Sequence, residues 1–258
     1  MARLLAPGGC PWDREQTLET LKPYLIEEAY EVLEAIDAAD PREHCEELGD
    51  LLFQIVFQSA LAAQAGRFTI DDVVTTICEK LVRRHPHVFA GLEVAGTDEV
   101  LKNWETIKAA ERAEKGRAER VLAGVPVALP ALSRAHRMTE KAARVGFDWP
   151  DVDGARQKVA EELGELDRAR AAGDAASVAS ELGDVLFAVT NLARKLKIDP
   201  EQALRTATRR FESRFEHMED RWRASGRSPN ELGLAELDRL WEEAKRALSL
   251  PGDLSPKK

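Results

Sequence analysis

The sequence predicts an all-α protein made of two copies of one helical module, and three observations support this prediction. Apolar residues recur every three or four positions through most of the 258 residues, which is typical of amphipathic helices. No segment alternates apolar and polar residues as a strand does, and 125–127 is too short and too rich in proline to form one. A pattern of acidic residues occurs twice, 134 positions apart, which indicates an internal repeat.

The first copy is expected to contain four helices. An apolar spine over 18–36 predicts the first helix, which Asp40-Pro41 ends, and a second follows over about 42–65 with Gly66 as its stop. A third helix opens at 70 and closes at 85–87, and a fourth covers about 98–112. The apolar residues of the second helix are expected to face inward: Leu48, Leu51, Leu52, Ile55, Val56 and Ala60.

The second copy repeats this order. Helical periodicity resumes at about 132, and further helices are expected over 157–171, 176–196, 200–224 and 234–248. The stretch between the copies is charged and poor in bulky apolar residues, and Pro126 and Pro130 follow it. We therefore expect an N-terminal helical module over 1–110, a linker over 111–131 and a C-terminal helical module over 132–258.

The composition narrows the classes of function. A net charge of -9 leaves no extended field of Lys and Arg for a phosphate backbone, so we expect no nucleic-acid polymer as a partner. The three cysteines have no disulfide or zinc spacing, which is typical of reduced thiols in the cytoplasm. Neither a signal peptide nor an apolar run of roughly 18 to 20 residues is evident, so a cytoplasmic protein without a membrane partner is expected.

The repeated acidic pattern is the strongest functional signal in the chain. Each copy reads E-E-x-x-E followed by E-L-G-D, which places acids three residues apart on two successive helices. The acids are symmetric about position 39 in the first copy and about Gly173 in the second, so an antiparallel hairpin brings them to the same height. The candidate metal ligands are Glu28, Glu31, Glu47 and Asp50 in the first copy and Glu162, Glu165, Glu181 and Asp184 in the second.

Four carboxylates at one point repel one another strongly unless a cation lies between them. Ligands that are all oxygen favour a hard cation, so we expect Mg²⁺, with Mn²⁺ as a substitute. A di-iron site is not expected, because neither copy contains a Glu-x-x-His motif. His85 and His87 suggest zinc, but without a third ligand nearby such histidines more often cap a helix. The alternative for the acids themselves is a solvated helix face, which the duplication of the whole array argues against.

Cations and aromatic residues accompany each acidic array. Both copies contain W-E-x-x-K, which places a Trp and a Lys four residues apart on one helical face, and both carry cations on the preceding helix. This combination indicates a nucleoside polyphosphate bound through a metal, with the cations on the phosphates and a Trp beside the base or sugar. The candidate nucleotide-binding residues are Lys80, Arg84, Trp104 and Lys108 in the first copy and Arg210, Arg214, Trp241 and Lys245 in the second.

Beside the repeated acids, three further segments carry a family resemblance: G-C-P-W-D at 9–13, R-R-H-P-H-V-F at 83–89 and V-G-F-D-W at 145–149. Together they closely resemble the MazG family of nucleoside triphosphate pyrophosphohydrolases, within the wider all-α pyrophosphohydrolase superfamily. The resemblance implies tandem four-helix modules in a homodimer whose interlocked helices complete the bundles. It also implies Mg²⁺-dependent hydrolysis of NTPs and dNTPs to the monophosphate and pyrophosphate, as housecleaning of the nucleotide pool. The chain departs from the family pattern at Thr208 and Arg210, where members carry Asn and Lys.

The mechanistic hypothesis is that Mg²⁺ held by the carboxylates activates a water, which attacks the α-phosphorus and releases pyrophosphate. Glu161 is a candidate to orient that water or to accept its proton. The resemblance implies that the second module can carry the activity alone, so we expect it to carry most of the turnover and the first mainly to support dimerisation, with residual activity. Two alternatives stay open: a pyrophosphatase of narrow specificity for dUTP or damaged dNTPs, and a non-catalytic helical protein that binds nucleotides. The sequence decides neither the preference for base or sugar nor the number of metal ions per site.

Overall fold

The fold was obtained as a computed structural model, and the structure describes residues 1–114, 120–226 and 229–248. Within these ranges every regular element is a helix and no strand occurs, which confirms the predicted all-α class. The chain divides into two compact units, Met1–Arg117 and Ala118–Lys258. The expected boundaries of the two modules and of the linker stay a prediction. The helix that begins at Thr97 continues to Glu114, which lies within the expected linker of 111–131.

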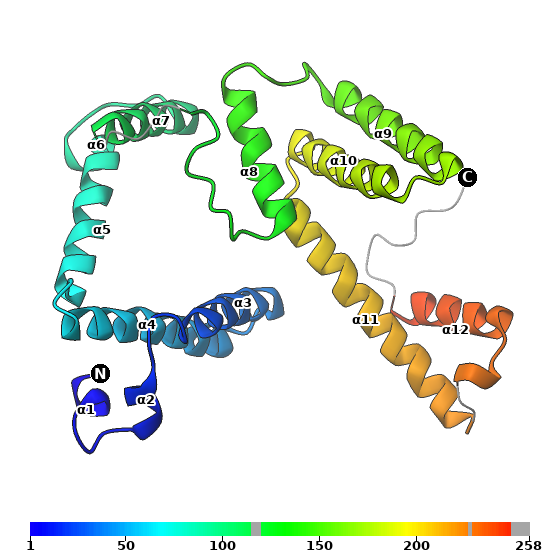
Figure 1. Cartoon of the computed structure of the whole chain (residues 1–258), viewed down its shortest axis with the longest axis horizontal. Coiled ribbons are helices and arrows are strands. Elements are labelled where there is room, and N and C mark those ends of the chain that lie inside the picture. Colours follow the sequence, from blue (N-terminus) through cyan, green and yellow to red (C-terminus); the bar gives the residue numbers. More distant parts are fainter. Residues whose placement is uncertain (115–119, 227–228, 249–258) are drawn as a thin grey trace. The chain divides into compact units, whose positions relative to one another are not determined.

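The centre of the first unit is an antiparallel hairpin of α3 (Lys22–Ala38) and α4 (Pro41–Gln64), visible in Figure 1. Ala39 adopts the left-handed conformation with φ 56°, and the Asp40 side chain accepts a hydrogen bond from the Arg42 amide at 2.8 Å. This αL residue followed by an N-cap reverses the chain within two residues, so the predicted turn is confirmed.

Further helices extend this hairpin. The short α1 (Ala2–Leu5) and α2 (Pro11–Glu15) precede it. The helix α5 (Ile70–Arg84) follows behind a Thr69–Asp72 capping box, then come the one-turn α6 (Pro86–Phe89) and α7 (Thr97–Glu114). The expected start of the first long helix was wrong, because Thr17 and Thr20 hydrogen-bond each other's amides in a turn that ends just before Lys22.

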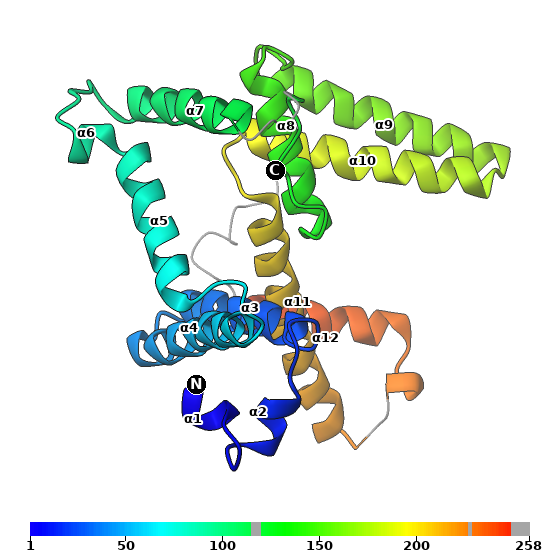
Figure 2. The same cartoon turned by 60° about the vertical axis from the view of Figure 1, so that its left-hand side comes forward.

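The second unit repeats the hairpin with α9 (Val152–Ala172) and α10 (Ala175–Lys195), which lie side by side in Figures 1 and 2. Gly173 supplies the left-handed residue of the turn with φ 72°, and Asp174 caps α10 through the amides of Ala176 and Ser177. The helix α9 begins five residues earlier than expected, because Asp151 accepts a hydrogen bond from the Gly154 amide and caps it.

Three more helices complete the second unit. The helix α8 (Ala131–Arg144) packs against α10, and the Ser133 amide donates to Glu201 at the start of α11 (Pro200–Ala224). After the short η1 (Pro229–Glu231), α12 (Leu234–Ala247) returns along α11. An apolar cluster stabilises the hairpin of α11 and α12: Met218, Trp222, Leu232 and Leu240.

The expected inward stripe of α4 is wrong for three of its six residues in the single chain, while Leu51, Val56 and Ala60 are half-buried. Leu48, Leu52 and Ile55 are exposed, and the buried residues of α4 are Gln54, Phe57, Ser59 and Ala62. The second unit shows the same arrangement, since Leu182 and Leu186 of α10 are exposed while Val185 and Ala188 are buried. Each hairpin therefore buries one face within its own unit and leaves a second apolar face uncovered in the single chain. Among the described helices, none is long and apolar enough to cross a membrane.

Candidate active site

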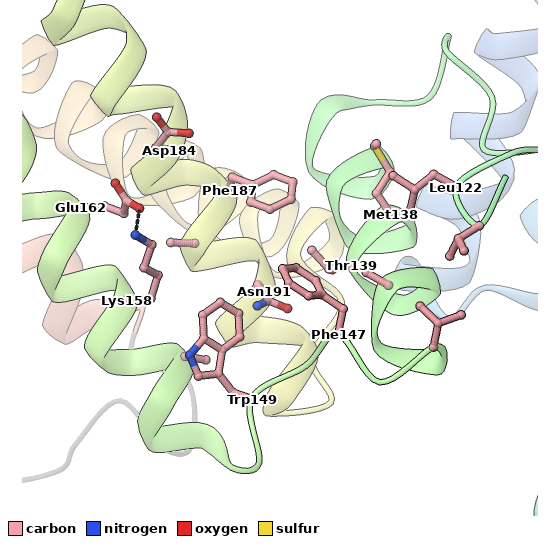
Figure 3. A pocket seen from close by; sticks show the side chains of 15 residues that line it. Leu122, Met138, Thr139, Phe147, Trp149, Lys158, Glu162, Asp184, Phe187 and Asn191 are labelled. Carbon is pink, nitrogen blue, oxygen red and sulfur yellow. Dashed lines mark ion pairs between the residues drawn. The ribbon is translucent and has the colours of Figure 1, made fainter.

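The second unit brings three of its four predicted metal ligands together. Glu162 and Glu165 lie one turn apart on α9, and Glu181 faces them from α10. One carboxylate oxygen from each lies within 4.8 Å of the other two, and Glu162 is buried. Asp184, one turn after Glu181, lies outside this group of three but lines a cavity together with Glu162, as Figure 3 shows. The hairpin thus converts the spacing in the sequence into a cluster of carboxylates at one level.

Sequence reasoning missed Lys158, which also belongs to this cluster. Its Nζ lies 2.7 Å from Glu162 and 2.8 Å from Glu161. Hydrogen bonds to Glu161 and then Glu162 raise the pKa of Lys158, so the ammonium stays charged beside the acids. The signal was present in the sequence, because a Lys three and four residues before two glutamates shares their helical face. Glu161 is exposed and paired with this Lys, on the edge of the cluster.

In the first unit, the cluster consists of Glu28, Glu47 and Asp50, whose oxygens also lie within 4.8 Å of one another. The Gln54 amide donates to Glu28 at 3.3 Å. Burial, with added repulsion from Asp50 and Glu31, raises the pKa of Glu28. Burial likewise raises the pKa of Glu47, with Glu31 as the first of the repelling neighbours. The fourth predicted ligand, Glu31, therefore acts on both of these acids although it lies outside the group of three.

The two clusters fit a hard divalent cation. Their donors are carboxylate oxygens from two helices, without the imidazole or thiolate that softer metals prefer. Beside burial, repulsion from neighbouring carboxylates contributes to the raised pKa values of Glu28 and Glu47, and a cation between them would remove that repulsion. The second cluster differs because the positive charge of Lys158 already lies against Glu162.

A cavity of about 550 Å³ opens beside the second cluster. Glu162, Asp184 and Lys158 lie at one side of it, and Asn191 lies further along α10. The remaining walls are mainly apolar and come from α8, α9, α10 and the segments before α8 and α9: Val121, Leu122, Met138, Phe147, Trp149 and Phe187. An apolar cavity of this size with a few polar groups at one end is typical of a site for a small organic ligand.

Two sets of contacts fix the position of Trp149, whose indole forms one wall of the cavity. Gly154 in the first turn of α9 leaves room for the indole, since a Cβ at this position would overlap the Trp149 ring. Asp148 is held by Arg194, which lowers the pKa of its carboxyl, and the Lys195 ammonium donates to the Trp149 carbonyl at 2.6 Å. The segment before α9 is therefore tied to the end of α10, and the indole is fixed at the cavity.

The first unit lacks the small side chains that leave this space open. Shifting by 134 positions, Ala155, Ala188 and Asn191 correspond to Leu21, Gln54 and Phe57. These larger residues are buried in the first unit, with 1%, 5% and 0% of their surface exposed. Lys158 corresponds to Tyr24, which cannot supply a positive charge. The repeat therefore preserves the carboxylates in both units, whereas at these described positions the small side chains and the lysine occur in the second unit.

The candidate nucleotide-binding residues of the first unit lie on α5 and α7. Arg84 pairs with Glu111, which Arg83 also contacts at 2.7 Å, so this cation is already neutralised within the unit. The Trp104 ring meets His85 edge-on at 5.0 Å, and the Lys108 ammonium lies 5.5 Å from the centre of the same ring. The remaining candidate, Lys80, lies on α5 and is partly exposed.

The candidate nucleotide-binding residues of the second unit lie on the hairpin formed by α11 and α12. Trp241 packs against Phe211 at 5.3 Å between ring centres and against the apolar cluster of that hairpin. Lys245 pairs with Glu242 at 2.6 Å, one turn earlier on α12. Arg210 and Arg214 lie on α11, and none of these four residues lines the cavity beside the carboxylates. Their roles in nucleotide binding stay predictions.

The fold and the site together define an all-α protein with a repeated helical hairpin, each copy carrying a carboxylate cluster suited to a divalent metal. Residues 16–89 and 153–219 match the MazG nucleotide pyrophosphohydrolase domain. The chain belongs to the MazG family. This membership confirms the predicted family, the duplication of the module and the predicted enzyme class, a pyrophosphohydrolase.

Relatives resemble the chain along nearly its whole length. It is 48% identical over 245 residues to a nucleoside triphosphate pyrophosphohydrolase/pyrophosphatase MazG of Thermotoga maritima, covering 95% of this chain and 92% of the relative. It is 44% identical over 249 residues to a nucleoside triphosphate pyrophosphohydrolase of Escherichia coli, covering 95% and 94%. It is also 46% identical to the protein YabN of Bacillus subtilis, where the match covers 94% of this chain and 49% of the relative.

Proposed function

We propose that the protein hydrolyses nucleoside triphosphates, both NTPs and dNTPs, to the nucleoside monophosphate and pyrophosphate, with Mg²⁺ as its metal. The observation that carries this proposal is the carboxylate cluster of Glu162, Glu165 and Glu181 beside a cavity of about 550 Å³. Such an arrangement joins a metal site to a space for an organic group, which a nucleotide requires. The names of the relatives from Thermotoga maritima and Escherichia coli support the same reaction.

In the second unit, Glu162, Glu165, Glu181 and Asp184 would hold the metal. When bound there, Mg²⁺ supplies charge neutralisation to the triphosphate and acidifies water. Lys158 exchanges its pairing with Glu162 for a phosphate oxygen, because phosphate and carboxylate are equivalent acceptors for an ammonium. Glu161, which shares Lys158 at 2.8 Å, is thereby released to orient the attacking water or to accept its proton.

The proposed enzyme works as a homodimer. Apolar residues lie exposed along the helices of both units, including Ile26 and Leu52 in the first unit and Leu186 and Phe215 in the second. Exposed apolar side chains in this number are typical of an interface that another copy covers. Sedimentation of the purified protein is expected to give a mass of twice 28.6 kDa.

Replacement of metal ligands tests the reaction. Glu162→Gln and Asp184→Asn each keep the size of the side chain and remove its charge, and each is expected to lower pyrophosphate release by about a hundredfold or more. Asp167→Asn is the matched control on α9, since Asp167 is exposed and pairs with Arg170 at 3.4 Å. Equal amounts of monophosphate and pyrophosphate establish the reaction. A protein that retains the triphosphate unchanged is the non-catalytic binder, and undiminished release by both variants removes the metal-site assignment.

A further inference from the structure

Asn191 presents a fixed hydrogen-bond donor to the cavity of the second unit. Its side chain is buried and lines the cavity, as Figure 3 shows. The Arg194 Nε donates to the Asn191 Oδ1 at 2.8 Å. The same guanidinium is held in place by Asp148, to which its Nη1 donates at 3.2 Å. Because the Arg194 N–H requires the amide oxygen on its side, the Nδ2 amino group of Asn191 lies on the other side of the amide, where it can donate to a ligand.

The other polar groups of the cavity away from the acids support this reading. The Thr139 hydroxyl donates its proton to the His136 carbonyl at 2.9 Å within its own helix. The Trp149 indole, which also lines the cavity, has an N–H that can donate but cannot accept. Glu162 and Asp184, the two strong acceptors of the lining, lie at the side of the metal cluster. The part of the cavity beyond the metal cluster therefore offers the Asn191 amino group as a donor between apolar and aromatic walls.

We propose that this cavity receives the nucleobase and that Asn191 selects bases with a carbonyl group on the recognised edge. Its volume and aromatic walls suit a flat heterocycle, and it adjoins the carboxylates where the triphosphate lies in the proposed function, on which this inference rests. A carbonyl oxygen, such as O4 of uracil or O6 of hypoxanthine and guanine, accepts from the Asn191 amino group. The exocyclic amino group of cytosine or adenine places a donor against that donor, which leaves both unsatisfied.

Two pairs of nucleotides that differ at this one group test the proposal: UTP against CTP, and ITP against ATP. For the wild-type protein with Mg²⁺, kcat/KM is expected to favour the carbonyl member of each pair by about threefold to tenfold, the size of one hydrogen bond. In Asn191→Ala both ratios are expected to fall to near one. A loss that is merely structural lowers kcat/KM for all four nucleotides and leaves the ratios unchanged, which would overturn the role of Asn191.

A second variant leaves Asn191 itself in place. Arg194→Met removes the group that holds the amide oxygen, so the amide can turn and offer either its oxygen or its amino group. Both ratios are then expected to approach one, and an undiminished preference would contradict the proposal. If the wild-type protein hydrolyses none of the four nucleotides, the proposed function fails. Binding of UMP against CMP and of IMP against AMP then measures the base preference separately, and equal affinities in the wild type would reject it.

Discussion

The Nζ of Lys158 lies 2.7 Å from the carboxylate of Glu162, one turn along α9, in the same cluster that the proposed metal occupies. The ammonium thus offsets the charge of a metal ligand in the protein without ligands, and a metal has to compete with it. The corresponding position of the first unit is Tyr24, which supplies no ammonium to compete with a metal there.

Replacing Lys158 by Met is therefore expected to affect two measurements in opposite directions. Mg²⁺ binding by the nucleotide-free protein becomes tighter in calorimetry, because the competing ammonium is gone. The kcat/KM for nucleoside triphosphates falls by about tenfold to a hundredfold, the range of one lost charge-assisted hydrogen bond to phosphate. Arg170→Met is the control, since Arg170 is exposed and pairs with Asp167 away from the cluster. Weaker Mg²⁺ binding in Lys158→Met would show that the ammonium supports the cluster rather than competing with the metal.

The two units are expected to contribute unequally to turnover. Glu162→Gln/Glu165→Gln should abolish NTP hydrolysis, whereas Glu28→Gln/Glu31→Gln should retain most of it, because Phe57 and Leu21 occupy the space that the cavity takes in the second unit. Pyrophosphate release from each double variant measures this, after sedimentation has shown that both have the oligomeric state of the wild type. Loss of activity in the first pair alone would reverse the assignment.

The indole of Trp149 depends on the absence of a side chain at position 154. Gly154→Ala is expected to displace the indole and raise KM for nucleoside triphosphates by about threefold to tenfold, since a wall of the cavity moves while the carboxylates stay. Gly164→Ala on the same helix is the control, because its Cβ would meet only Arg168, at an ordinary 3.7 Å. Equal KM values for the two variants would show that Trp149 does not contact the substrate.

Glu111 is expected to make the first unit sensitive to acid. Hydrogen bonds from Arg84 and then Arg83 hold its pKa at about 2, below the ordinary 4.5. Because the folded state binds fewer protons than the unfolded state between these values, the contribution of Glu111 to stability is complete above about pH 4.5 and is lost as the pH falls through about 2.

Thermal unfolding of Glu111→Gln tests this linkage. At pH 7 we expect a Tm lower by roughly 2–4 °C, or about 1 kcal/mol, a modest value because Arg83 is half exposed and solvent screens the pair. The difference from wild type should shrink as the pH is lowered from about 4.5 toward 2. Glu79→Gln on the exposed face of α5 is the control. A Tm difference that does not change with pH would exclude the ion pair as its cause.

The sequence by itself determined the helices, their repeat and the carboxylate clusters. These features depend on local spacing: Glu162 and Glu165 share a helical face because they are three residues apart, and the turn at Gly173 places Glu181 opposite them. The caps at Asp40 and Asp174 are local as well, which is why the turns were predicted correctly. The starts of α3 and α9 were predicted wrongly from the apolar periodicity, because hydrogen bonds of Thr17 and Asp151 decide where these helices begin.

Only the tertiary structure decided which face of each hairpin is buried and where the cavity lies. Leu52 and Phe57 are both apolar residues of one helix, yet the first is exposed and the second has 0% of its surface exposed, since burial depends on the neighbours that other helices supply. The cavity likewise joins Met138 of α8, Trp149 before α9 and Asn191 of α10, which only the packing of these helices brings together. The orientation of the Asn191 amide is set by Arg194, and Arg194 is held in turn by Asp148. Asp148 lies 46 residues before Arg194 in the chain, and no spacing rule connects residues at that distance.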